Sequence, residues 1–315
     1  MPGVGKTALG LTLAQCLKDQ WHDAQIFLDL HGADPKRRPP LSATAAMQEV
    51  IHAFRPSTKL PESEDELRPI YLSVLQEEHR KILLLFDNVA SAEQVRRLLP
   101  PPNCLLLVTS RQHFTLPGLK WKDVDCLTPE QSAALLRKLA PRVEQDAARA
   151  AEICGHLPLA LEIVAGIVND KNLFPVAELL DRVSAKEEKL TPVEAAFEVS
   201  FELLSETERQ NWYLLAVFKD SFDLHAVETV WGIAAVFDRE EQQRVTTDAT
   251  KNNRGNDTRE AMQVLVNANL VQWNKTTGRF RLHDLARQFC DGKRRYVMLK
   301  AYANATSTAF RPSSL

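Results

Sequence analysis

The first ten residues read MPGVGKTALG (residues 1–10), and they decide how the rest of the chain is interpreted. Glycines free the backbone to turn its N–H groups inward, and a helical pattern begins directly after them, where the helix dipole favours an anion. The spacing of Gly5, Lys6 and Thr7 fits the G-x-x-x-x-G-K-[ST] phosphate-binding loop, whose first glycine would fall immediately before Met1. The stretch predicts that Lys6 reaches the β- and γ-phosphates of a nucleotide and that the Thr7 hydroxyl lies on Mg²⁺.

A second polar signal lies about eighty residues further on, in KILLLFDN (residues 81–88). Its apolar run ends at Asp87, which has the place and chemistry of the Walker-B aspartate that holds magnesium in P-loop proteins. Asn88 follows, where many P-loop ATPases carry a second acid. Because an amide cannot accept a proton, we expect no fast hydrolysis. Taken alone, Asp87 is equally consistent with a surface residue that closes a strand.

A third apolar run, NCLLLVTSR (residues 103–111), ends at Arg111. A guanidinium there is able to bind a γ-phosphate through two hydrogen bonds. A solvated loop arginine is the alternative for Arg111 taken alone.

Helical and strand patterns alternate up to about residue 125, as expected for an α/β layer with a parallel sheet. Residues 24–30 form a short apolar strand pattern, and the apolar runs without alternation at 81–88 and 103–111 are typical of strands buried on both faces of such a sheet. The predicted fold class is therefore an α/β P-loop NTPase domain.

The strand patterns stop after this region. Thr128 and Gln131 form a capping box at the start of a helix, and further helices are expected near 145–155, 158–169 and 175–184, which makes a small all-α bundle. From residue 192 onward, about three helices precede a short hairpin at 269–282, which is the pattern of a winged helix. The predicted domains are 1–125 (α/β, nucleotide-binding), 126–190 (helical), 191–291 (winged helix) and 292–315 (polar tail), with a flexible loop at 245–257.

Composition gives no global signal for a charged partner. Lys and Arg total 39 against 41 Asp and Glu, a formal net charge of −2, so binding to nucleic acid or to an acidic membrane is not expected from charge. The five cysteines are odd in number and widely spaced, which favours small buried residues in a reducing compartment over zinc or disulfides. No apolar run approaches the roughly 20 residues of a membrane span, and no signal peptide is visible. We therefore expect a cytoplasmic protein with no membrane partner.

Five motifs, taken in their order along the chain, resemble the NB-ARC module of STAND-class signal-transduction ATPases. Within that class, the motif sequences are most similar to those of bacterial transcriptional regulators. The motifs are GVGKT (3–7), ILLLFDN (82–88), LLVTSR (106–111), CGHLPLAL (154–161) and RLHDL (281–285). The resemblance covers residues 1 to about 290. Its fold would be the α/β domain, the helical bundle and the winged helix.

The resemblance implies a site for ADP or ATP with Mg²⁺. Thr7 and Asp87 match the magnesium contacts, Arg111 the arginine that senses the γ-phosphate, and Pro158 the proline that packs on base and sugar. His283 matches the histidine that reaches the β-phosphate of ADP and holds the domains closed, although Leu282 stands where the family usually has Met. The nucleotide-binding residues expected are Gly3, Val4, Gly5, Lys6, Thr7, Ala8, Arg111, Pro158 and His283.

The activity implied is that of a molecular switch. ADP would lock a closed state, and exchange for ATP would permit opening and self-association, with slow hydrolysis as the reset. Sensor and effector domains, unknown here, would act with it. Read without the resemblance, Pro158 is a proline at the first position of a helix and His283 a polar residue at a helix N-terminus.

Two other functions stay open. A steady-turnover ATPase or kinase is disfavoured because Asn88 replaces the second acid and no catalytic base is evident. A DNA-binding regulator would use the winged helix. The candidate recognition helix, residues 258–270, has one Arg and one Glu and so lacks the basic face that phosphate contacts require, and Arg279, Arg281 and Arg287 add only slight local basicity. Nucleic-acid binding is therefore unlikely by this reasoning.

The position of Met1 leads to one further expectation. In the family a strand near the middle of the sheet precedes the phosphate loop, so we expect an incomplete module whose first strand is missing. We expect the gap to lie between the strand at 81–88 and its neighbour, and nucleotide affinity to be weakened.

Overall fold

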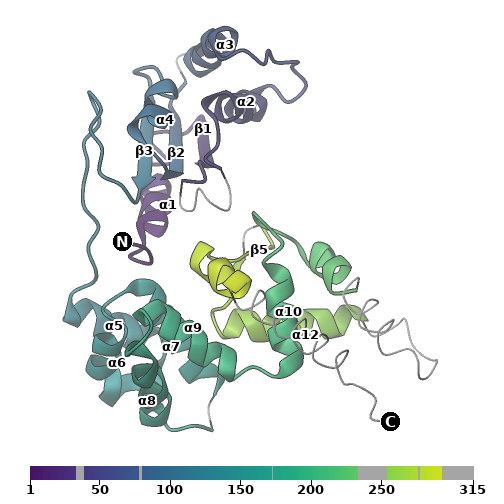
Figure 1. Ribbon diagram of the computed structural model, residues 1–315. Helices are drawn as coiled ribbons and strands as arrows, with labels where there is room; N and C mark the ends of the chain where they lie inside the picture. Colours follow the sequence, from purple (N-terminus) through teal and green to yellow (C-terminus); the bar gives the residue numbers. More distant parts are fainter. Residues whose placement is uncertain (33–38, 78–79, 172, 233–253, 276, 293–315) are drawn as a thin grey trace, which may run out of the picture. The chain divides into compact units, whose positions relative to one another are not determined.

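The structure is a computed structural model, and the chain divides into two compact units, Met1–Asp125 and Cys126–Leu315 (Figure 1). Each unit is described by itself. The residues that the structure describes are 1–32, 39–77, 80–171, 173–232, 254–275 and 277–292.

Three parallel strands form the sheet of the first unit. They are β1 (Ala24–Asp29), β2 (Ile82–Val89) and β3 (Cys104–Ser110), in the order β1-β2-β3. The register pairs Asp29 with Asp87 and Leu85 with Leu107, so all three carboxyl ends meet at one edge. The predicted parallel α/β sheet is confirmed.

The prediction that a strand is missing beside the strand at 81–88 is wrong. β2 is hydrogen-bonded to β1 along one side and to β3 along the other, so both of its edges are already paired. A further strand would have to pair at the outer side of β1 or of β3.

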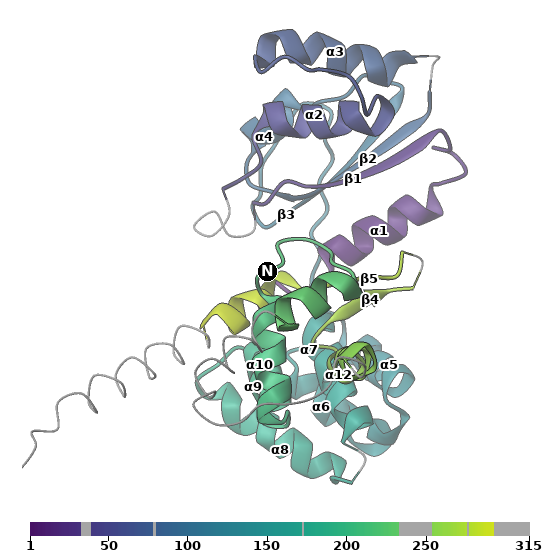
Figure 2. The same cartoon turned by 90° about the vertical axis from the view of Figure 1, so that its right-hand side faces the viewer.

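Alternate residues of β2 enter two different cores, because successive side chains of a strand point to opposite faces. Leu84 and Phe86 lie in the larger core with α2 (Ala43–Phe54), α3 (Glu64–Gln76) and α4 (Ala92–Arg97). Leu83 and Leu85 lie in a smaller core with Ala14 of α1 (Lys6–Cys16). Figure 2 shows α1 on one side of the sheet and the other three helices on the opposite side.

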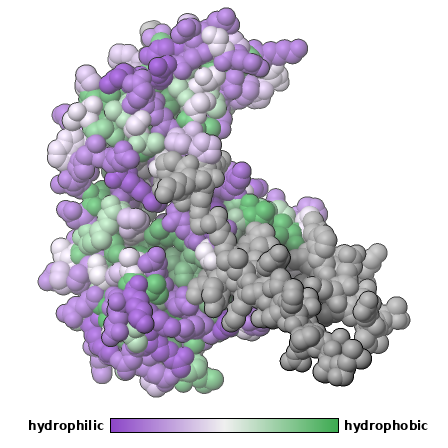
Figure 3. Space-filling model, in the orientation of Figure 1, coloured by the Kyte–Doolittle hydropathy of each residue, from purple (hydrophilic) through white to green (hydrophobic). Residues whose placement is uncertain are grey.

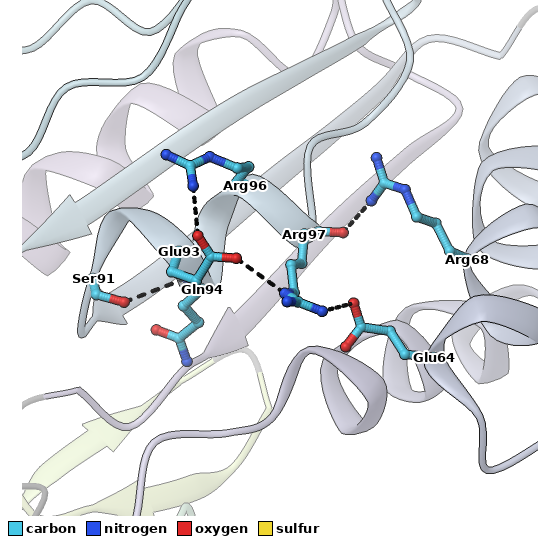
Figure 4. A network of polar contacts seen from close by, with 7 residues as sticks. All are labelled: Glu64, Arg68, Ser91, Glu93, Gln94, Arg96 and Arg97. Carbon is cyan, nitrogen blue, oxygen red and sulfur yellow. Dashed lines mark hydrogen bonds and ion pairs between the residues drawn. The ribbon is translucent and has the colours of Figure 1, made fainter.

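The short helix α4 was not expected from the sequence. Ser91 is its N-cap and accepts a hydrogen bond from the backbone N–H of Gln94, so the S-x-x-Q spacing at 91–94 was an available signal. Arg97 of α4 forms ion pairs with Glu64 of α3 at 2.7 Å and with Glu93 at 3.1 Å (Figure 4). Exposed pairs of this kind contribute little to stability, so the buried Val95 is the main anchor of α4.

The second unit is mainly helical. Thr128, Thr191 and Ser205 each begin a helix with a complete capping box. Its elements are α5 (Pro129–Leu139), the 3₁₀ helix η2 (Pro141–Asp146), α6 (Ala147–Ile153), α7 (Pro158–Asp170), α8 (Val176–Glu187), α9 (Pro192–Glu202), α10 (Glu206–Leu215), helical residues 224–232, α12 (Arg254–Asn267), β4 (Gln272–Asn274), β5 (Arg279–Arg281) and helical residues 284–292.

An aromatic cluster holds the later part of this unit together. Trp212 of α10 is fully buried, with ring centroids 5.7 Å from Phe289 and 6.1 Å from Phe197 of α9. Stacked and tilted aromatic pairs of this spacing stabilise a core beyond the area that they bury. Helices far apart in sequence therefore share one core.

The hairpin β4–β5 is antiparallel, as expected, but the winged-helix assignment and the boundary at 190/191 stay predictions. The loop predicted at 245–257 is partly wrong, because α12 begins at Arg254 and the last four residues of that stretch are helical. Residues 245–253 and the tail from 293 onward lie outside the described residues.

Hydrophilic residues cover most of the described surface on the face drawn in Figure 3, with smaller apolar areas between them. Among the described residues, no helix is both long and apolar enough to cross a bilayer.

Close helix packing in the second unit predicts the effect of Gly166→Ala. A Cβ at this position of α7 would lie 2.8 Å from the carbonyl carbon of Ala268 and from the side-chain nitrogen of Asn269. Since both lie in the segment that follows α12, we expect a loss of about 1–3 kcal/mol in unfolding free energy, measured by chemical denaturation. The control is Gly232→Ala, which meets no atom within 4 Å. Equal stability of both variants would contradict this packing.

Candidate functional site

The glycine-rich loop has the backbone shape that its sequence predicts. Gly3 and Gly5 have φ of 79° and 90°, in the left-handed region where a Cβ is unfavourable, and Gly5 is the N-cap of α1. Val4 is buried, which anchors the loop. The Lys6 ammonium donates to the Met1 carbonyl oxygen at 2.6 Å. Unpaired N–H groups at the first turn of a helix make this end of α1 suitable for an anion.

Asp87, at the carboxyl end of β2, is the centre of the site. Its side chain is fully buried, and it accepts a hydrogen bond from the Thr7 hydroxyl, whose Oγ1 lies 2.9 and 3.0 Å from the two carboxylate oxygens. The Thr109 hydroxyl of β3 donates to the same carboxylate. Residues 80 and 22 positions away in sequence therefore converge on one buried acid.

Thr7 and Asp87 fit a magnesium site. Hydroxyl and carboxylate oxygens are hard ligands, and Mg²⁺ is usually held by one or two such groups together with phosphate oxygens and water. Within the described part of the chain, no group of three or more His, Cys, Asp and Glu could hold a metal by itself. A cation here would therefore depend on a bound phosphate. It would supply positive charge against that phosphate.

A second chain of hydrogen bonds continues from Thr109 across the strand ends. The Asn88 backbone N–H donates to the Thr109 Oγ1 at 3.1 Å. The Asn88 side-chain amide donates to the Asp29 carboxylate of β1 at 3.2 Å, and the His31 N–H donates to the same oxygen at 2.9 Å. Asn88 has φ of 53°, a left-handed conformation that Asn tolerates better than most residues.

Two further residues, Gly32 and Gln94, fix the loop that follows β1. The Gly32 N–H donates to the Asn88 carbonyl at 2.6 Å, and a Cβ on Gly32 would lie 2.4 Å from that oxygen, so only glycine fits. The Gln94 amide donates to the carbonyls of Leu30 and Leu41 at 3.1 and 2.8 Å, and its oxygen accepts from the Ala90 N–H. The loops after β1 and β2 are thus held against each other.

Lys6 and Arg111 line one cavity of about 350 Å³ in the first unit. Arg111 follows directly after β3. Burial lowers the pKa of Lys6 below its ordinary value, and the nearby Arg111 guanidinium lowers it further, while Asp87 acts in the opposite direction. Two cations brought together at a helix N-terminus favour an anionic ligand.

Pro158 and His283 belong to the second unit. Pro158 is the first residue of α7, and it is preceded by two left-handed residues, Gly155 and His156. His283 precedes the helical residues 284–292, and its Nδ1 accepts a hydrogen bond from the Leu285 N–H at 3.1 Å. Pro158 is thus a proline at the first position of a helix, and His283 is a polar residue at a helix N-terminus, as the sequence without the resemblance predicts.

His283 also lines a cavity of about 280 Å³ in the second unit. Leu159, which adjoins Pro158, and Glu162 of α7 line the same cavity. Burial raises the pKa of Glu162 above its ordinary value, although the residue is exposed at the surface overall.

The structure thus brings together part of the expected set. Lys6, Thr7, Asp87 and Arg111 lie around the carboxyl ends of the strands of one unit, with Gly3, Val4, Gly5 and Ala8 in the same loop and helix. Sequence reasoning missed Asp29 and Thr109. The rule that ligands bind at the carboxyl ends of parallel strands would have pointed to both, since each is the last or next-to-last residue of its strand.

Comparison with known proteins gives relatives that are longer than this chain. It is 29% identical over 301 residues to the regulatory protein AfsR of Streptomyces coelicolor, covering 91% of this chain and 28% of AfsR. It is 28% identical over 253 residues to a putative HTH-type transcriptional regulator of Mycobacterium tuberculosis, covering 72% of this chain and 27% of that protein. No family model matches the chain.

Among solved structures, the chain is similar to the Signal Transduction ATPase with Numerous Domains (STAND) protein PH0952, with a tetratricopeptide repeat sensor, from Pyrococcus horikoshii. The TM-score is 0.56 at 13% identity, covering 91% of this chain and 38% of that one, which shows a shared fold. Together these findings confirm the resemblance to STAND-class P-loop ATPases. They do not support the expectation that nucleic-acid binding is unlikely, because the relatives include proteins named as transcriptional regulators.

The Thr109 hydroxyl accepts a hydrogen bond from the Asn88 N–H and donates one to Asp87. This double role predicts the effect of Thr109→Val. Valine keeps the shape of the side chain but removes the hydroxyl that donates to the buried Asp87 and accepts from the Asn88 N–H, so we expect unfolding free energy to fall by about 1–3 kcal/mol. Thermal and chemical denaturation would measure the loss. Thr109→Ser, which retains the hydroxyl, is the control and should lie closer to the original protein. If serine and valine were equally destabilising, the hydrogen bonds would not be the cause.

Proposed function

We propose that the chain is a nucleotide-controlled switch that binds ADP or ATP with Mg²⁺ at the carboxyl ends of β1, β2 and β3. The observation that carries this proposal is the Thr7 hydroxyl on the buried Asp87 carboxylate at 2.9 Å, directly after a glycine-rich loop whose Lys6 shares a cavity with Arg111. A helix N-terminus, two cations and a hard-oxygen pair are the groups that a nucleotide with magnesium requires.

The switch works through differential affinity. A nucleotide shifts a conformational equilibrium only by the difference between its affinities for the two states. At a concentration about 1,000 times its dissociation constant for the closed state, and with no binding to the open state, ADP would stabilise the closed state by about 4 kcal/mol. By the resemblance, ADP retention depends on Pro158 and His283, and exchange for ATP transfers the contact to Arg111.

Self-association of the ATP form, together with unknown sensor and effector domains, belongs to this proposal, as does a cytoplasmic location. Further domains are supported by the relatives, because the matched region covers only 28% and 27% of their length. Turnover should be slow because Asn88 cannot accept a proton. A rate well above roughly one per second would favour a steady-turnover ATPase or kinase instead.

DNA binding is the second candidate function, because relatives are named as HTH-type transcriptional regulators. Arg279 of the proposed wing contacts its own unit, which favours a packing role over DNA binding. Arg279 donates from Nε to the Ser221 hydroxyl at 2.9 Å and from Nη2 to the Ser221 carbonyl at 2.7 Å, so its guanidinium is used inside the unit. A gel-shift assay with the purified chain, with and without nucleotide, decides between the two functions.

Loss of the phosphate and magnesium contacts should abolish nucleotide binding. We expect Lys6→Ala to weaken ADP and ATP binding at least about tenfold, since a charge-assisted contact is lost. Asp87→Asn, which keeps a carbonyl oxygen for Thr7 and Thr109, should remove the magnesium dependence. Calorimetry with and without Mg²⁺ measures both effects. The control is Lys18→Ala, an exposed lysine just beyond α1. A chain that binds no adenine nucleotide before mutation would refute the proposal.

The role proposed for His283 can be separated from its role at the helix start. Asparagine is a good N-cap, so His283→Asn should leave stability nearly unchanged. We expect ADP to dissociate several-fold faster from this variant, with ATP affinity little altered, as measured by stopped-flow fluorescence with labelled nucleotides. His225→Asn is the control, because its side chain is exposed. Unchanged ADP release in both variants would remove His283 from the switch.

A further inference from the structure

We propose that Asp29, at the carboxyl end of β1, is the acid that binds the attacking water when the site hydrolyses ATP, and that the Asn88 amide orients it. This inference rests on the proposed nucleotide binding and adds to it a residue from a neighbouring strand. The site would then be a slow ATPase with two acids, Asp29 and Asp87. In the sequence, α2 and α3 lie between these two residues.

The register of the sheet places Asp29 beside the magnesium acid. Asp29 and Asp87 are paired residues of neighbouring parallel strands, and side chains at paired positions project to the same face. Asp87 meets Thr7 of the phosphate loop on that face. Asp29 is half-buried, so part of the residue remains accessible to solvent.

The orientation of the Asp29 carboxylate is fixed by two donors. Asn88 Nδ2 and the His31 N–H lie 3.2 and 2.9 Å from the same oxygen, Oδ1. One donor is a side chain of β2 and the other is a backbone N–H two residues after β1, so together they restrict the rotation of the Asp29 side chain. A carboxylate held in this way is suited to accept a hydrogen bond from a water molecule in a defined position.

The same geometry explains why residue 88 is an amide. Asn88 joins Asp29 to the group of Thr109 and Asp87 through its backbone N–H and its side chain. An aspartate at position 88 would place a carboxylate where the Asn88 amide now donates to Asp29, and an ionised carboxylate has no proton to donate. The neutral amide instead supplies the donor that orients Asp29. The site therefore still has a second acid, Asp29, although position 88 is an amide.

The reaction step balances without any further reactant. The water oxygen forms a bond to the γ-phosphorus, and the bond from that phosphorus to the β,γ-bridging oxygen breaks. ADP leaves with the electron pair of the broken bond. Of the two water protons, one ends on inorganic phosphate and one passes to solvent. Asp29 positions the water by accepting a hydrogen bond from it. The positive charges of Lys6 and Arg111 stabilise the negative charge of the phosphate.

The test compares Asp29→Asn with Asp23→Asn in the full chain. Asparagine at 29 still offers an oxygen to Asn88 and His31, so the fold is retained while the charge is lost. Asp23 precedes the opposite end of β1 and accepts from the Lys81 N–H at 2.6 Å, which makes it a matched aspartate away from the site. Asn88→Gly is a second variant, because glycine keeps the left-handed backbone and removes only the amide that orients Asp29.

Three quantities are measured: affinity for Mg·ADP, the gain in affinity when aluminium fluoride is added to mimic the phosphoryl group in transfer, and conversion of bound ATP to ADP in a single turnover. We expect Asp29→Asn to keep Mg·ADP affinity within about threefold, to lose the aluminium fluoride gain, and to slow conversion at least about tenfold. Asn88→Gly should show a smaller loss of the same two quantities, and Asp23→Asn none.

An Asp29→Asn variant that retains the aluminium fluoride gain and the conversion rate would overturn the role of Asp29 while leaving nucleotide binding intact. The same conclusion follows if the original chain binds Mg·ADP but shows neither the gain nor conversion. A chain that binds no nucleotide at all overturns the proposed function and this inference together. Loss of Mg·ADP affinity in Asp29→Asn would instead identify Asp29 as a binding residue and contradict the assignment to water.

Discussion

The buried carboxylate of Asp87 is the interaction on which the first unit depends. It accepts hydrogen bonds from a hydroxyl of α1 and from a hydroxyl of β3, so it ties the phosphate loop, the central strand and the outer strand together. A fully buried acid is costly unless such donors surround it. The residue that suits magnesium therefore also holds the loop in the shape that phosphate binding needs.

The rest of the site follows from the parallel sheet. Because all three strands run in one direction, their carboxyl ends and the loops after them gather at one edge, where Asp29, Asn88 and Thr109 form a continuous chain of hydrogen bonds. Gly32 and Gln94 then hold two of these loops in contact. In the proposed site, the magnesium acid Asp87 and the proposed water-binding acid Asp29 therefore lie on neighbouring strands.

His283 of the second unit combines a structural role with the role proposed for it in the switch. His283 caps the helical residues 284–292 through Nδ1, and it lines a cavity with Leu159 and Glu162 of α7. In the neutral ring, acceptance at Nδ1 leaves the proton on Nε2, which is a suitable donor for a phosphate oxygen. Nε2 would be the ring nitrogen that donates in the proposed contact to ADP.

The sequence by itself determined the local elements: the glycine-rich loop, the three apolar strands, the capping boxes at Thr128 and Ser205, and the fold class of the first unit. Those features depend on neighbouring residues, whose spacing is visible in the chain. Tertiary structure alone decided that β2 is paired on both sides, that α12 begins at Arg254 and that Asp29 faces Asn88. Each of these depends on which distant segments pack together, and strand order and side-chain partners 59 positions apart leave no periodic trace in one sequence.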